Sequence, residues 1–142
     1  MTRPAFAPRL RLLRDASDEL IDELEAGIAD SERALRARDT KRWADAIGAF
    51  TDTLVEHSGN RYAAELLERM RNVLSLIANV SQVAPGRRER SIEEHQAILE
   101  AIRLRDPEAA AEATRAHLRS IETDSMRAIA EVSEQEAVGS EI

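Results

Sequence analysis

The chain has 142 residues, of which 43% are hydrophobic but only 3% aromatic, so a single domain with an aliphatic core is expected. A formal charge of −7 argues against general nucleic-acid binding, and the absence of cysteine excludes disulfides, a thiolate nucleophile and a thiolate metal site. Five glycines and four prolines leave little turn chemistry for an all-β fold, whereas abundant Ala, Leu, Glu and Arg favour helices, so the composition predicts an all-α protein.

The N-terminal part of the chain predicts a short lead-in followed by two helices. Residues 1–9 carry two prolines and are expected to be extended. From about Arg9 to Arg38 apolar residues recur at helical spacing, which predicts one long amphipathic helix, or two with a break near Asp15–Ser17. A further helix is predicted at about 41–57, because Ser58-Gly59-Asn60 follows it and glycine readily adopts the left-handed cap conformation.

The next predicted helix, at about 61–82, has the densest apolar stripe, so we expect it to be central in the fold. Asn72, Ser75 and Asn79 form a polar strip along it at helical spacing. This strip has two interpretations. It is either the solvated side of the helix or the lining of an internal polar cavity.

Two more helices are predicted in the C-terminal part, joined by a short turn. Residues 84–90 are expected to form a basic loop, after which Ser91 and Glu94 have the spacing of a capping box that opens a helix. Asp106 followed by Pro107 predicts the start of the last helix, with an N-cap acceptor and then proline at the first helical position. The short connection makes the two helices antiparallel neighbours.

The three histidines differ in their expected environment. His95 lies eleven residues before Asp106 and His117 eleven after it, and each is on the apolar stripe of its helix. The two imidazoles are therefore expected to meet at one level of the interior. His57 falls in the last turn of its helix, where a surface imidazole suits the helix dipole.

The domain is expected to span residues 10–132, because residues 133–142 lack periodicity and are expected to fray. No apolar run approaches the ~20 residues of a membrane span. The N-terminus also lacks the apolar core of a signal peptide, so no membrane contact and a cytoplasmic location are expected.

The order and spacing of several short motifs resemble the FCD domain, the C-terminal effector-sensing domain of the FadR subfamily of bacterial GntR-type transcription regulators. The likeness covers roughly residues 10 to 130 and rests on Phe50, Ser58-Gly59-Asn60, Glu94-His95, Ala101-Ile102, Asp106, Ala109 and His117-Leu118. The resemblance implies an antiparallel bundle of about six helices around a small-molecule pocket, and commonly a homodimer. Within such a pocket, Thr51, Asn72, Ser75 and Asn79 are candidate effector contacts, and a carboxylate is the expected effector.

The resemblance also implies a divalent metal, Zn or Ni, which many members bind through an Asp and three histidines. His95 and His117 correspond to two of these ligands, whereas Ile47 and Thr51 replace the Asp and the third His. Two imidazoles with water and a threonine hydroxyl bind a divalent ion weakly unless a carboxylate effector completes the shell. The alternative is that His95 and His117 are a hydrogen-bonded polar pair in a metal-free pocket.

Regulators of this family carry a winged helix-turn-helix before the sensing domain, whereas this sequence enters the sensing domain directly. We therefore expect either a domain taken from a longer regulator or a free-standing relative, and no direct binding of nucleic acid by this chain.

Effector sensing is the function that the sequence favours over two alternatives. One alternative is a helical scaffold for dimerisation or protein interaction. The other is a metal-dependent enzyme, which is disfavoured because Glu93 and Glu94 are expected to point away from the histidines and leave no base beside them.

Overall fold

The computed structural model describes residues 18–140, except for the side chains of Leu74 and Ala78. This part of the chain contains five helices and no strand: α2 (Asp18–Arg36), α3 (Thr40–His57), α4 (Arg61–Ser81), α5 (Arg87–Arg103) and α6 (Pro107–Gly139). The predicted all-α fold is confirmed. The predicted lead-in at 1–9 and the break near Asp15–Ser17 lie outside the described residues.

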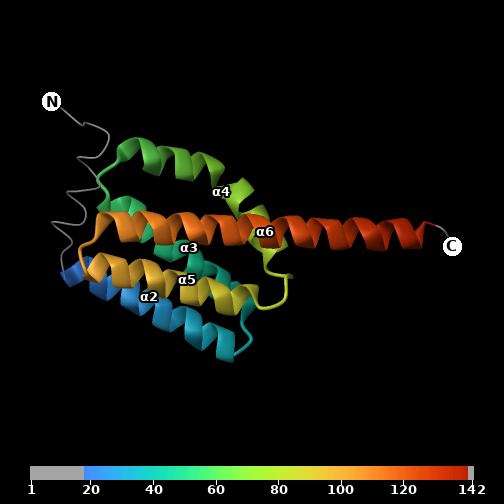
Figure 1. Cartoon of the computed structure of the whole chain (residues 1–142), viewed down its shortest axis with the longest axis horizontal. Coiled ribbons are helices and arrows are strands. Elements are labelled where there is room, and N and C mark those ends of the chain that lie inside the picture. The colour runs from blue at the N-terminus through green and yellow to red at the C-terminus, as the bar shows by residue number, and fades with distance from the viewer. Residues whose placement is uncertain (1–17, 141–142) are drawn as a thin grey trace.

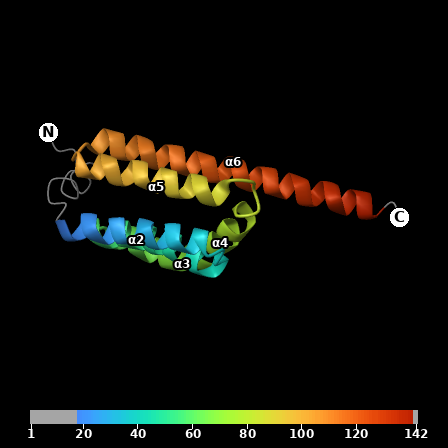
Figure 2. The ribbon, with the colours of Figure 1, turned by 90° about the horizontal axis from the view of Figure 1, so that it is seen from below.

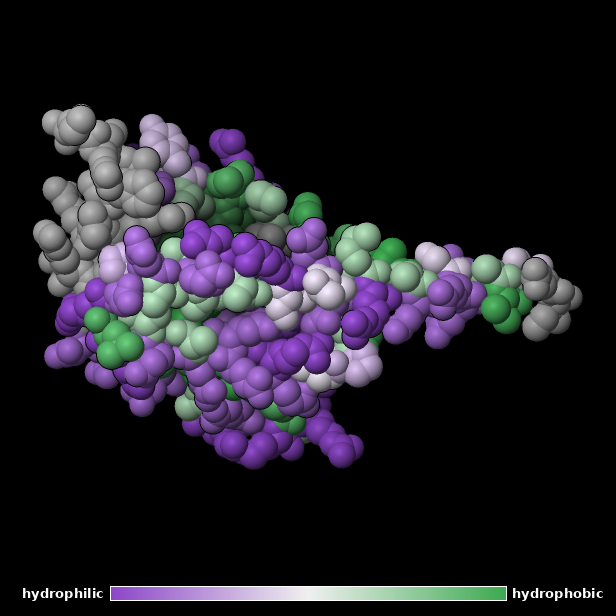
Figure 3. Space-filling model, in the orientation of Figure 1, coloured by the Kyte–Doolittle hydropathy of each residue, from purple (hydrophilic) through white to green (hydrophobic). Residues whose placement is uncertain are grey.

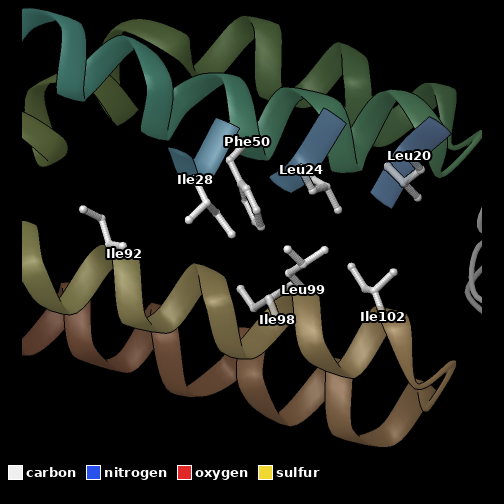
Figure 4. Close-up of a cluster of buried hydrophobic side chains, with 8 residues drawn as sticks. All are labelled: Leu20, Leu24, Ile28, Phe50, Ile92, Ile98, Leu99 and Ile102. Carbon is white, nitrogen blue, oxygen red and sulfur yellow. The ribbon is translucent and has the colours of Figure 1, made fainter. Parts of the chain in front are cut away.

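Two helical hairpins form the core of the molecule. The α2–α3 hairpin faces the α5–α6 hairpin, and successive helices run in alternating directions (Figures 1 and 2). Apolar side chains from α2, α3 and α5 fill the space between them (Figure 4): Leu20, Leu24, Ile28, Phe50, Ile92, Ile98, Leu99 and Ile102. Burial of this aliphatic surface, with one aromatic ring, is the main stabilising contribution to the fold.

Local capping explains three of the helix ends. The Asp39 carboxylate accepts a hydrogen bond from the backbone N–H of Arg42 at the start of α3. Asp106 accepts in the same way from the N–H of Ala109, so the predicted start of the last helix at Asp106-Pro107 is confirmed. Gly59 adopts the left-handed conformation after α3, with φ of 66°, as the sequence indicates.

The predicted capping box of Ser91 and Glu94 is wrong. Helix α5 begins one turn earlier, at Arg87, and its N-cap is Gly86, with φ of 74° and no side-chain cap. Ser91 and Glu94 are interior residues of the helix, where their side chains bind other side chains instead of the backbone of the first turn. The predicted loop at 84–90 is therefore partly helical.

Helix α4 is not central, contrary to prediction. None of its described apolar side chains is buried, and Leu66, Val73 and Leu76 are each more than half exposed. Helix α4 contacts α3 and α6 along one side and lies outside the two-hairpin core (Figure 1). An apolar stripe identifies the face of a helix that is to be buried, but it does not specify what covers that face.

The last helix is longer than the sequence indicates. Residues 133–139, which we expected to belong to a frayed tail, continue α6 to Gly139 and are exposed as the helix projects beyond the bundle (Figures 1 and 2). No helix within residues 18–140 combines the length and the apolar character that crossing a membrane requires.

Candidate functional site

The two predicted inward histidines meet inside the bundle. The rings of His95 on α5 and His117 on α6 pack edge to face, with their centroids 4.9 Å apart. Both residues are buried. The mirror-image placement of the two histidines about the α5–α6 turn therefore predicts their contact correctly.

Phe50 of α3 packs against the imidazole of His95. Its ring stacks on the imidazole of His95, with centroids 4.0 Å apart and planes inclined by 13°. This environment is apolar, and burial, with smaller contributions from nearby His117 and Arg87, lowers the pKa of His95 from 6.5 to about 3. His95 is consequently a neutral imidazole at neutral pH.

A buried guanidinium organises the polar side of the site. Arg87 is 1% exposed, and its Nε donates to the Ser91 hydroxyl at 3.0 Å. Its Nη1 donates to the Ser120 hydroxyl at 2.7 Å and to the Asp124 carboxylate at 2.9 Å, and its Nη2 donates to Glu94. Arg87 therefore fixes α5 to α6 through charge-assisted hydrogen bonds.

The histidine pair joins this network through Glu94. His117 donates from Nδ1 to a carboxylate oxygen of Glu94 at 2.6 Å, and the same oxygen accepts from Arg87. Burial alone would raise the pKa of the Glu94 carboxyl, but the hydrogen bonds from His117, Ser120 and Arg87 outweigh it and leave that pKa below its usual value. Glu94 thus remains an anion.

Asp124 is the second anion of the network and binds two arginines. Besides Arg87, it accepts from Nη2 of Arg90 at 2.7 Å. Burial acts to raise the pKa of Asp124, but its bonds to Arg90 and Arg87 lower it overall. The negative charges of the Glu94 and Asp124 carboxylates are therefore neutralised by the positive charges of the Arg87 and Arg90 guanidiniums.

Sequence reasoning missed this network, although a signal for it was present. Arg87 lies 19 residues before Asp106 and Asp124 lies 18 after it, so the two residues are expected at nearly the same level of the hairpin. The same holds for Glu94 and His117. The signal was overlooked because residues 84–90 were expected to be loop, and Glu94 was expected to point away from the histidines, which is wrong.

The other predicted site residues lie apart from the buried network. Thr51, Asn72, Ser75 and Asn79 are all exposed on α3 and α4. His57 is in the last turn of α3, as predicted, and its Nε2 lies 3.2 Å from Glu23 of α2. Thus the structure brings together His95 and His117 with three residues not predicted as partners: Arg87, Glu94 and Asp124.

The residues around the histidines do not fit a divalent metal. Within residues 18–140 no group of three or more His, Cys, Asp or Glu side chains is arranged to hold such an ion. Helix α3 presents the apolar ring of Phe50 to His95, while Thr51 is exposed and Ile47 has no donor atom. On the other side, Nδ1 of His117 is engaged by Glu94.

One family profile, that of the FCD domain, matches the chain over residues 10–120. Comparison with the curated proteins and with the solved structures gives no match. The profile covers every residue of the buried network up to Ser120 and ends before Asp124.

Proposed function

Because this chain belongs to the FCD domain family, the ligand-sensing domains of GntR-family regulators, we propose that it senses a small organic acid or acyl compound for a FadR-type transcription regulator in the cytoplasm. The profile match over residues 10–120 carries the proposal. The polar layer of buried His95, His117 and Arg87 with partly buried Glu94 supports it, since such groups add ligand-binding chemistry to an otherwise aliphatic interior.

We propose that the chain is not an enzyme. FCD domains are regulatory, and Glu94, the carboxylate nearest to the histidines, is held by Arg87 and His117. A carboxylate that accepts two charge-assisted hydrogen bonds is a weak base. In a sensor, the same groups position and neutralise one another, and ligand binding acts by shifting the packing of helices.

Effector binding is tested by thermal unfolding of the ligand-free protein with acetate, succinate, citrate and octanoate in turn. We expect one class of acid to raise the Tm by several degrees at saturating concentration, and the rise to persist with EDTA, because the donor set does not fit a metal. Asn72→Ala should reduce the rise if the exposed strip with Thr51, Ser75 and Asn79 contacts the effector, whereas Thr123→Ala on α6 is the matched control. If no organic acid shifts the Tm, the proposal fails.

A second feature favours a homodimer. The α4 apolar face, which we define as Leu66, Met70, Val73 and Ile77, is between 39% and 58% exposed at each residue. Figure 3 shows apolar surface along α4 and along the projecting part of α6, where Met126, Ile129 and Val132 are also exposed. Contiguous apolar patches of this kind are typical of protein interfaces, and we propose that a second copy of the chain covers them.

Val73→Glu is expected to shift the protein to monomer, with the dimer dissociation constant raised at least tenfold, because a carboxylate would be buried at the interface. Sedimentation velocity over a concentration series measures the change. Leu104→Glu is the control, since Leu104 is a 70% exposed leucine at the α5–α6 turn, away from the α4 apolar face. A wild-type protein that is monomeric at all concentrations rules out the homodimer.

A further inference from the structure

Two buried donors at one end of the bundle have no hydrogen-bond partner among the described residues. They are Nε1 of Trp43, a residue only 3% exposed, and Nε of Arg88; the hydroxyl of Ser125 is a third such atom. Indole Nε1 and guanidinium Nε can only donate. A buried donor without a hydrogen bond costs free energy. A group that supplies acceptor oxygens to these two atoms would therefore be bound favourably.

The helix register places Trp43 and Arg88 on facing sides of α3 and α5. Trp43 lies seven residues before Phe50, and Arg88 lies seven residues before His95. Seven residues are about two helical turns. Trp43 therefore lies on the same side of α3 as Phe50, and Arg88 on the same side of α5 as His95, each about 10 Å nearer the start of its helix. Phe50 and His95 stack directly on each other, and α3 and α5 both begin at the end of the bundle from which α6 projects (Figures 1 and 2).

Of the three arginines in the first turn of α5, one has no anionic partner among the described residues. Arg87 and Arg90 are paired with Glu94 and Asp124, whereas Arg88 forms no ion pair with any residue that the structure describes. Helix α5 also begins without a side-chain cap at Gly86, and the free N–H groups of a first helical turn carry partial positive charge. Glu89, the acidic residue of this turn, is exposed.

We propose that Trp43 and Arg88, beside the uncapped start of α5, form a binding site for the carboxylate or phosphate group of a small anionic ligand. The indole N–H and the guanidinium Nε–H each donate to an oxygen of the anion, and the helix start adds electrostatic attraction. This inference rests on the proposed sensing function and assigns to it an anion site that needs no metal and that lies two turns from the histidine pair.

Trp43 is the only tryptophan of the chain, so its fluorescence reports directly on this site. We expect titration with sodium acetate, sodium succinate or inorganic phosphate, at constant ionic strength in sodium chloride, to give a saturable change in Trp43 emission. A response to acetate or succinate identifies a carboxylate ligand, and a response to phosphate alone identifies a phosphorylated one. The absence of any saturable change with all three anions overturns the proposal.

Arg88→Gln is expected to weaken anion binding at least tenfold, because it removes the positive charge of the guanidinium. Arg69→Gln, which removes an exposed arginine from α4, is the matched control and should bind as the wild type does. Trp43→Phe, examined by thermal unfolding, should still fold, since an aromatic ring remains and the donor that it removes has no partner. It should lose the anion-dependent rise in Tm.

Equal anion affinity in Arg88→Gln and the wild type would overturn this site. An organic acid that raises the Tm of Arg88→Gln and of the wild type equally would also overturn this site. The proposed sensing function would then stand, with its ligand bound elsewhere on the protein. Failure of every organic acid in the wild type would instead contradict the sensing function itself.

Discussion

Arg87→Met is expected to lower the free energy of unfolding by about 3–5 kcal/mol, the usual cost of leaving buried charges without their partner. Arg87 is 1% exposed, and the variant would leave the buried Asp124 and the partly buried Glu94 with fewer donors. Methionine keeps a flexible apolar chain of similar length, so the loss reports on charge and hydrogen bonding more than on packing. Urea unfolding followed by circular dichroism measures it.

Arg90→Met is the matched control, because Arg90 binds the same carboxylate, Asp124, but has a 38% exposed side chain. Its loss should be at most about 1 kcal/mol, as is usual for solvent-accessible pairs. Adding Asp124→Asn to Arg87→Met should recover part of the stability, because it removes one of the stranded charges. An Arg87→Met protein as stable as Arg90→Met would show that the network does not hold α5 to α6.

The sequence predicts most of the features that depend on local spacing. Asp106-Pro107 starts a helix because its capping chemistry is contained in four consecutive residues, and the structure confirms it. His95 and His117 meet because two helices joined by a short turn bring equidistant residues together. In both cases the information lies within a single hairpin.

Features that depend on distant partners were not predictable from local patterns. Ser91 and Glu94 have the spacing of a capping box, but a guanidinium one turn earlier binds both side chains, so the tertiary contact overrides the local motif. The apolar stripe of α4 predicts a helix correctly, whereas its position outside the core depends on which elements cover it. Phe50 as the neighbour of His95 likewise needs the packing of α3 against α5.

Acidification from pH 6.5 to 5 is expected to destabilise the protein by about 2 kcal/mol through His95 alone, at a limiting slope of about 1.4 kcal/mol per pH unit. Burial lowers the pKa of His95 from 6.5 to about 3, so between these values the unfolded chain binds a proton that the folded protein does not. The stability associated with neutral His95 is therefore complete above pH 6.5 and is lost as the pH falls toward 3.

Between pH 6.5 and 5, the effect of His95 on stability can be measured apart from that of the carboxylates of the network. The lowered pKa values of Glu94 and Asp124 make their stabilising contribution fall only at lower pH, below their ordinary values of 4.5 and 3.8. Urea unfolding of the wild type and of His95→Gln at pH 7, 6 and 5 tests the assignment. The wild type should lose stability more steeply than His95→Gln, whatever the absolute stability of the variant. Parallel pH profiles would mean that His95 accepts a proton in the folded state, which its stacking against Phe50 and its packing against His117 argue against.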